Sequence, residues 1–317
     1  MRIMPLGTSS GRPTRTRGMS ALALDLGAQW ILVDAGEGTQ HQLLRFGLPT
    51  SRLAAVLITH LHGDHVLGLP GLLSTLALNG RVEPLTVIGP DGLGRLLSGF
   101  ADVGVLNLPF PLELTELVDD RGDGASTELR PCPTVAGHRI VAVALRHRVP
   151  CHGFRVTAPE RRGRFDAVAA ERLGLPHGPE RGRLAAGFEV TVGGRVIAPG
   201  DVVAPSRPGV SVAVFGDTTP CSAARALAHG CALVVHEATY ADGMEAEAEM
   251  WRHSTARQTA TVARDAGAGR LILTHFSSRY PVIDQLVHEA ARCSRRATPP
   301  SRGPGSRPRA EPGRGPS

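Results

Sequence analysis

The chain of 317 residues is long enough to bury a full hydrophobic core, and its hydrophobic content of 42% is that of a globular protein. No apolar run reaches the roughly 18 residues that a membrane helix needs, and residues 1–7 are too short and broken for a signal peptide, so we expect a cytoplasmic protein that contacts no membrane. The net charge of +6 is weak evidence for a nucleic-acid partner, because residues 295–317 hold six arginines against one acid and account for +5 of it.

The N-terminal part of the chain is predicted to form a β-hairpin followed by a helix. Residues 21–26 and 30–34 are mostly apolar and flank a turn at Gly27, which is typical of two antiparallel strands. A helix is expected over about 36–46. The segment 7–17 carries three arginines and no acid, so it could equally hold a phosphate group or form an ordinary solvated loop.

The densest group of potential metal ligands follows an apolar segment at 53–58, which is predicted to be a buried parallel strand. The next residues include His60, His62, Asp64 and His65, and ligands commonly bind at this end of a strand in α/β folds. His60 and His62 are spaced to point at one ion, whereas Asp64 and His65 are offset toward a second. The motif therefore indicates two divalent ions, and zinc fits this set of nitrogen and oxygen donors. Surface histidines gathered by chance are the alternative, which this density and placement disfavour.

Three later strands are predicted to end on a further potential ligand. The apolar segments 140–145, 210–215 and 271–274 are followed by His147, Asp217 and His275, respectively. A fourth strand, at 233–237, ends in Glu237, which could orient the ligands. We therefore expect these strand ends to converge on one cleft with His60.

The remaining histidines are given simpler interpretations. His138 and His152 flank the strand at 140–145 and compete with His147 for the ligand role, but His147 is favoured because it follows the strand end. Surface or helix-cap positions are expected for His41, His177, His229 and His288.

Residues 155–208 interrupt the alternation of strands and helices. They contain nine arginines against six acids, several Gly/Pro turns and a hairpin at 188–192 and 195–197. Because such an insertion can bury little of its own surface, we expect an arm with a turn-rich tip at 174–179. A mobile surface loop is the simpler alternative.

The other predicted elements are regular and lie outside this insertion. They are a helix at 68–78, a strand at 85–88, and helices at 222–229, 254–266 and 281–292. From Ser294 onward the chain is rich in Ser, Pro, Arg and Gly, and we expect it to be disordered.

The order of the ligands, His-x-His-x-Asp-His followed by isolated His, Asp and His at strand ends, resembles the metallo-β-lactamase superfamily. A set of shorter motifs in the same order is similar to those of the ribonuclease Z family, the tRNA 3′-processing endonucleases, and the match covers about residues 1–292. These motifs are Val33–Gln40, Gly68–Leu73, His147–Pro150 with Gly153–Arg155, Gly216–Thr218, His236–Thr239, His253–Ala256 and Thr274–Tyr280.

The resemblance implies an α/β fold, a metallo-β-lactamase-like four-layer αββα sandwich with a protruding arm, and an assembly as a homodimer. The two halves of the core would be residues 1–154 and 209–293, the arm would be 155–208, and 294–317 would be a disordered tail. One departure concerns the end of the core. The family continues past Arg292 into a last core segment, whereas this chain enters low complexity there.

The resemblance also implies a zinc-dependent endoribonuclease that removes the 3′ trailer from precursor tRNA, leaving a tRNA 3′-OH and a 5′-phosphorylated trailer. One zinc ion would be held by His60, His62, His147 and Asp217, and the other by Asp64, His65, Asp217 and His275. Asp64 would orient or deprotonate the attacking water, and His253 with Glu237 would supply a proton to the leaving oxygen. The RNA would be bound by Arg15, Arg17, Arg155, Arg161, Arg162, Arg164, Gly178 and Pro179.

Two other functions are compatible with parts of this pattern. A small-molecule hydrolase of the same superfamily, acting on thioesters, lactones or sulfate esters, would need neither the arm nor the basic N-terminal segment. A catalytically inactive RNA-binding relative would tolerate the loss of any ligand, whereas this chain has the whole set. We therefore expect the precursor-tRNA endonuclease.

Overall fold

The computed structural model describes residues 1–118, 123–293 and 297–298. The chain divides into two compact units. The first is formed by Met1–Thr157 together with the chain from Ser211 onward, and the second, called here the arm unit, is Ala158–Val210. Among the described residues, no helix combines the length and the apolar character needed to cross a membrane.

The first sheet of the larger unit has six strands in the order β1-β3-β4-β5-β6-β7. They are β1 (Arg2–Gly7), β3 (Ala21–Asp25), β4 (Trp30–Val33), β5 (Leu53–Leu57), β6 (Leu85–Pro90) and β7 (Leu112–Leu117). β1, β3 and β4 pair antiparallel, whereas β4 to β7 run parallel. Parallel strands need crossover connections, which are supplied by the helices α1 (Thr39–Arg45), α3 (Leu69–Leu78) and α4 (Leu93–Asp102).

Both faces of this sheet are buried, which explains why its strands read as nearly continuous apolar runs. In β4, Trp30 and Leu32 belong to the core formed with α1, α3 and α4. Their neighbours Ile31 and Val33 point to the opposite face and join a second core, which lies between the two sheets.

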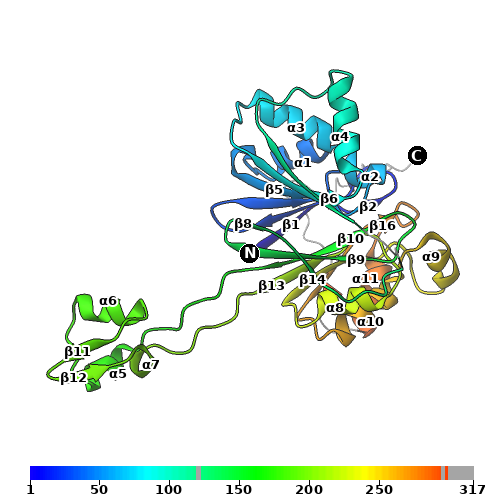
Figure 1. Ribbon diagram of the computed structural model, residues 1–317. Coiled ribbons are helices and arrows are strands. Elements are labelled where there is room, and N and C mark those ends of the chain that lie inside the picture. The colour runs from blue at the N-terminus through cyan, green and yellow to red at the C-terminus, as the bar shows by residue number, and fades with distance from the viewer. Residues whose placement is uncertain (119–122, 294–296, 299–317) are drawn as a thin grey trace, which may run out of the picture. The chain divides into compact units, whose positions relative to one another are not determined.

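The second sheet has seven strands in the order β17-β15-β14-β13-β10-β9-β8. They are β8 (Arg130–Val135), β9 (His138–Ala144), β10 (His152–Thr157), β13 (Ser211–Val214), β14 (Leu233–Glu237), β15 (Leu271–Thr274) and β17 (Ala297–Thr298). Its outer face packs on α8 (Ser222–Ala228), α10 (Ala256–Asp265) and α11 (Asp284–Cys293) (Figure 1). Helices therefore cover the outer face of each sheet, and the expected αββα sandwich is confirmed.

The larger unit also contains five short elements. They are the strands β2 (Ser9–Ser10) and β16 (Phe276–Ser277), which pair with each other, the helices α2 (Gly63–Val66) and α9 (Glu245–Trp251), and a 3-10 turn at Thr50–Arg52. The pairing of β2 with β16 ties the N-terminal segment to the chain that follows β15.

The predicted strands and helices of the core agree with the structure, but the end of the chain does not. The expectation that no core segment follows Arg292 is wrong, because β17 adds two residues to the sheet beside β15, with Ala297 opposite Leu271. The other residues of the predicted disordered tail, 294–296 and 299–317, lie outside the described residues. α4, α9, β7, β8 and β10 were not predicted.

The arm unit contains three helices and one hairpin, and the hairpin was expected. The elements are α5 (Ala167–Arg172), α6 (Pro179–Ala185), β11 (Val190–Val192), β12 (Arg195–Ile197) and α7 (Pro199–Val202). Most side chains of this unit are exposed or half-buried. It nevertheless has a small core of its own, in which the buried side chains are Ala170, Leu175, Leu184, Val190, Ile197 and Val202.

Candidate metal centre

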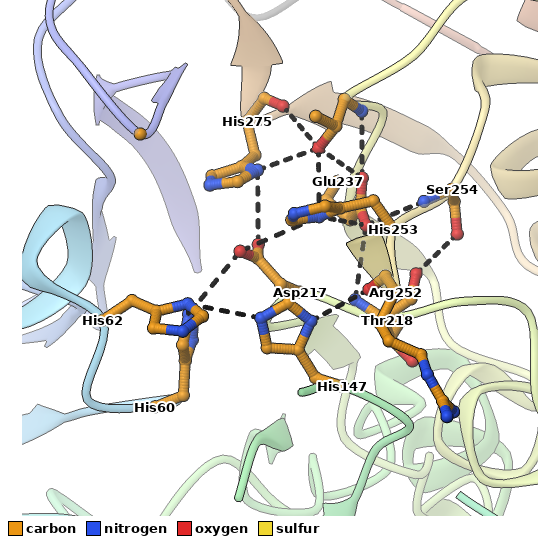
Figure 2. Close-up of polar contacts among 12 residues, drawn as sticks. His60, His62, His147, Asp217, Thr218, Glu237, Arg252, His253, Ser254 and His275 are labelled. Atoms are coloured by element: carbon orange, nitrogen blue, oxygen red, sulfur yellow. Dashed lines mark hydrogen bonds and ion pairs between the residues drawn. The ribbon is translucent and has the colours of Figure 1, made fainter. Parts of the chain in front are cut away.

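Seven side chains from four parts of the chain meet at the strand ends, and they are called here the metal centre. They are His60, His62, Asp64, His65, His147, Asp217 and His275. Asp217 lies in the middle, with His60, His62 and His147 on one side of it and His275 on the other (Figure 2). The structure thus brings together all seven residues that the sequence suggested as metal ligands.

The first group consists of His60, His62, His147 and Asp217. The Nδ1 atom of His62 is 3.0 Å from Nε2 of His60 and 3.3 Å from Nε2 of His147. Asp217 Oδ2 is 3.5 Å from Nε2 of His60. Three ring nitrogens and one carboxylate oxygen therefore face the same point, which is a donor set typical of zinc.

The second group consists of Asp64, His65 and His275. Nε2 of His275 lies 3.1 Å from Nε2 of His65 and 3.2 Å from Oδ2 of Asp64. Asp217 also reaches this group, because its Oδ2 is 3.5 Å from Nε2 of His65 and its Oδ1 is 3.3 Å from Nδ1 of His275. One carboxylate therefore touches both groups.

Asp34, which the sequence did not suggest as a site residue, is hydrogen-bonded to His65 of the centre. Its Oδ2 accepts a 2.8 Å hydrogen bond from Nδ1 of His65, and its Oδ1 accepts one of 2.8 Å from the backbone N–H of Thr59. This carboxylate holds Nδ1 of His65 and turns Nε2 toward the centre, where Nε2 can bind an ion once its proton is displaced. The position of Asp34 in the sequence could have indicated this contact, because Asp34 directly follows β4 and β4 neighbours the strand that leads to His60.

Burial and charge set the protonation of the centre. Burial lowers the pKa of His60 well below its ordinary value, helped by the nearby His65, so His60 stays neutral and keeps a free lone pair. Burial opposes ionisation of Asp217, but His275 and His65 outweigh it and hold the pKa of Asp217 well below its ordinary value. Burial also opposes a charge on His65, yet Asp217 and Asp34 raise its pKa well above the ordinary value.

These features fit a pair of divalent ions. Nitrogen lone pairs that face one another at about 3 Å repel unless a proton or a metal ion lies between them. The raised pKa of His65 means that a proton supplies positive charge at this point until an ion displaces it. The second nitrogens of His65 and His147 are each bound to a fixed acceptor, Asp34 Oδ2 and the Arg252 carbonyl, as is common for metal-binding histidines.

The buried Glu237 and the largely buried His253 form a pair next to Asp217 (Figure 2). Nδ1 of His253 lies 3.1 Å from Oε1 of Glu237 and 3.9 Å from Oδ2 of Asp217. Burial disfavours the charged form of His253, but the carboxylates of Glu237 and Asp217 outweigh it and raise its pKa to about 9. The imidazole therefore carries a proton at neutral pH.

Local sequence explains why His253 is held in place. Thr255 caps α10 by accepting from the N–H of Gln258, and the Gln258 side chain accepts from the N–H of Thr255 at 2.9 Å. Ser254 donates its N–H to Glu237 at 2.9 Å. Thr239, which was not predicted, donates its hydroxyl to Oε2 of Glu237 at 2.7 Å.

An open cavity of about 390 Å³ borders the centre beside the N-terminal segment. Its lining comprises Gly11, Arg12, Pro13, Met19, Glu37, His62, Gly63, Asp64 and Leu67. The backbone N–H of Gly11 donates to Oδ2 of Asp64 at 2.7 Å. The N-terminal segment therefore lies against the centre, and Arg12 faces the space next to it.

The arginines suggested for RNA binding fall into two classes. Arg17 donates to the backbone carbonyls of Ser277 and Tyr280, and Arg155 lies on β10 and donates to the carbonyl of His229, so both are occupied by structural contacts. Arg155 is thus outside the arm unit, which begins at Ala158. The exposed members of the set are Arg15, Arg161, Arg162 and Arg164, and Gly178 and Pro179 begin helix α6 of the arm unit.

The other histidines lie outside the centre. His41, His177, His229 and His288 are exposed, as expected. His138 and His152 are buried, but neither belongs to a metal-competent cluster of the described residues. His147 is therefore the histidine of this region that reaches the centre.

Comparisons with known proteins agree with this geometry. Residues 29–168 match the model of the β-lactamase superfamily domain. The chain is 46% identical to Ribonuclease Z of Salinibacter ruber over 284 residues, covering 88% of this chain and 85% of that protein. It is 41% identical to Ribonuclease BN of Escherichia coli K12 over 286 residues, covering 88% of this chain and 90% of that protein.

A solved structure with a similar fold is the short form of human tRNase Z. It superposes with a TM-score of 0.66 at 28% identity, covering 88% of this chain and 94% of that one. The metallo-beta-lactamase fold protein YhfI of Bacillus subtilis superposes with a TM-score of 0.65, but at 18% identity it shows a shared fold alone.

Proposed function

Because the chain belongs to the ribonuclease Z family of metallo-β-lactamase-fold endonucleases, we propose that it removes the 3′ trailer from precursor tRNA with two zinc ions. The family makes it a phosphodiesterase. The expected products are a tRNA with a free 3′-OH and a trailer with a 5′-phosphate. We also propose that it works as a homodimer.

The proposed ion sites follow the two groups of the metal centre. His60, His62 and His147 would hold one zinc ion, Asp64, His65 and His275 the other, and Asp217 both. When bound, such a pair lowers the pKa of a nearby water and offsets negative charge on the scissile phosphate.

Asp64 is proposed as the group that orients or deprotonates the attacking water. It is mostly buried, and the N–H of Gly11 and the ring of His275 fix its carboxylate. Burial opposes its ionisation, but the hydrogen bond with His275 and the charge of His65 lower the pKa of Asp64 below its ordinary value. It therefore stays an anion that can accept a hydrogen bond from water.

His253 is proposed as the acid that protonates the leaving oxygen of the ribose. A ribose alkoxide is a poor leaving group, so a proton must reach it as the bond to phosphorus breaks. The carboxylate of Glu237 keeps the imidazole protonated, and the pKa of about 9 means that the proton is present at neutral pH. His253 is partly accessible, with 13% of its side chain exposed, whereas only 1% of the Glu237 side chain is exposed.

The arm unit is proposed to bind the body of the tRNA. Its arginines Arg161, Arg162 and Arg164 are exposed and close in sequence, which suits contacts with phosphate groups. Among the described residues of the arm unit there is no metal-competent cluster, so the arm is assigned binding and no chemistry.

One observation carries the proposal most strongly, namely that one buried carboxylate, Asp217, contacts both ligand groups and lies beside the His253–Glu237 pair. The test is to incubate the purified protein with zinc and a 3′-extended precursor tRNA and to analyse both new ends. We expect a single cut that leaves the stated ends, with zinc bound at two per chain. An intact precursor, or trimming one nucleotide at a time, would contradict the proposal.

A further inference from the structure

The short helix α9 lies against the loop that carries His147, defined here as Arg146–Arg148. Each residue of this loop contacts the C-terminal half of α9 or the residue that follows it. Arg146 Nη2 pairs with Glu249 Oε1 at 2.8 Å. The guanidinium of Arg148 lies over the indole ring of Trp251, 4.9 Å from its centroid.

The contact made by His147, the middle residue of the loop, involves the metal centre directly. Nδ1–H of His147 donates to the backbone carbonyl of Arg252 at 2.9 Å (Figure 2). This bond leaves Nε2 as the unprotonated nitrogen, and that atom faces Nδ1 of His62 across 3.3 Å. The Arg252 carbonyl thus selects the tautomer and the ring orientation that a metal ligand needs.

Arg252 holds its carbonyl in this position through an unusual backbone conformation. Its φ of 58° lies in the left-handed region, which costs free energy for a residue other than glycine. The turn ends α9 and lets the next residue, His253, donate its N–H to the carbonyl of Ala248 at 2.7 Å. His147 and His253 are therefore fixed by the same turn.

Core packing does not account for the position of α9. Ala248 is its one buried side chain, while Met250 is 69% and Trp251 47% exposed. Arg146 and Glu249 are 35% and 55% exposed, and a single surface ion pair of this kind stabilises a fold very little. The three contacts converge on a single loop, and their common effect is to fix the ring of His147.

We propose that Glu249–Arg252 is a clamp for the His147 loop, in which Glu249 and Trp251 are positioning residues for one metal site. The inference rests on the proposed function, because it takes His147 as a metal ligand. Glu249 and Trp251 lie outside the metal centre, and they act through the loop and through the carbonyl of Arg252. Loss of such outer contacts typically weakens metal binding by about 10- to 100-fold.

The test measures zinc affinity by competition with a chromophoric chelator, for the wild type and for a double variant, Glu249→Ala with Trp251→Ala. We expect the double variant to bind one of the two ions about tenfold more weakly. His147→Ala identifies that ion, since it should weaken the same binding step more severely. Glu249→Ala alone should weaken that step by about fivefold or less, as expected for an exposed ion pair.

Three controls separate a clamp from a general effect on stability. Glu247→Ala removes an acid from the same helix without touching the loop, and Trp251→Phe keeps an aromatic ring, so both should bind zinc like the wild type. Arg146→Glu should weaken binding, and adding Glu249→Arg should restore it. The melting temperature of the zinc-free protein should be the same for all of these variants.

Two results would overturn the clamp. One is a double variant that binds both ions with wild-type affinity. Another is a charge swap that fails to restore what Arg146→Glu removes. Failure of the proposed function looks different, because a wild-type protein that binds two zinc ions but leaves precursor tRNA uncut contradicts the function and leaves the clamp standing.

Discussion

The metal centre and the arm unit differ in how they hold their charged residues. In the centre the polar groups are buried and bound to fixed partners, as with Asp34, Thr59 and His65. In the arm, Arg161, Arg162 and Arg164 are exposed. Hydrolysis needs groups fixed to a fraction of an ångström, whereas phosphate contacts tolerate movement. Substitutions in the centre should therefore reduce turnover, and those in the arm should reduce binding.

The largest effect is expected for Asp64→Ala. The residue is proposed both as an ion ligand and as the group that orients the water, so cleavage of precursor tRNA should fall by about 10⁴-fold or more. Binding of the precursor, measured by filter retention at fixed salt, should change little. Turnover near the wild-type level would remove Asp64 from the mechanism.

His253→Ala should reduce cleavage of precursor tRNA by about 10²- to 10³-fold, because the leaving ribose oxygen loses its proton donor. The same variant should hydrolyse bis(p-nitrophenyl) phosphate nearly as fast as the wild type, since nitrophenolate leaves without protonation. The paired rates test the role of the imidazole. Equal losses on both substrates would mean that His253 supports the ion sites instead.

The arm is tested by replacing Arg161, Arg162 and Arg164 together with alanine. If each contacts one phosphate, the slope of log K against log salt for tRNA binding should become shallower by about 2 to 3 units. The matched control replaces three exposed arginines of the larger unit, Arg45, Arg95 and Arg225, and removes the same charge. A similar change in both triple variants would assign the effect to net charge.

The sequence predicted that these seven side chains would meet, because they follow apolar strands whose pattern can be read directly. Asp34 and Thr239 were missed because their roles depend on contacts between separate strands. The left-handed turn at Arg252 could not be predicted, because arginine rarely adopts a positive φ. Helix α9 was not predicted because Ala248 is its one buried side chain, so its sequence shows no helical repeat of apolar residues.

The arm was harder to predict than the sheets. Its hairpin was expected because Gly193 and Gly194 supply a turn with positive φ between two short strands. Its helices were missed because their apolar faces are narrow: α5 buries Ala170 and α6 buries Leu184. Ala170 and Leu184 belong to the same small core, so their burial can be recognised only in the folded unit.

The smallest effect is expected for the C-terminal residues 299–317, which lie outside the described residues. They are rich in proline and glycine and lack aromatic side chains, so ordering them on RNA would cost about 1 kcal/mol or more per residue. Truncation after Thr298, which keeps β17, should leave the salt slope of tRNA binding unchanged. A slope shallower by two or more units would show that these residues bind RNA.

The division between chemistry and binding is tested most directly by removing the arm and measuring two substrates. The backbone N–H of Ala158 donates to the carbonyl of Val210 at 3.0 Å, so a two-residue Asn-Gly turn can replace everything between them. We predict that this variant loses most cleavage of precursor tRNA through a higher KM and hydrolyses bis(p-nitrophenyl) phosphate like the wild type. An equal loss on both substrates would contradict the division and show that the arm supports the metal centre.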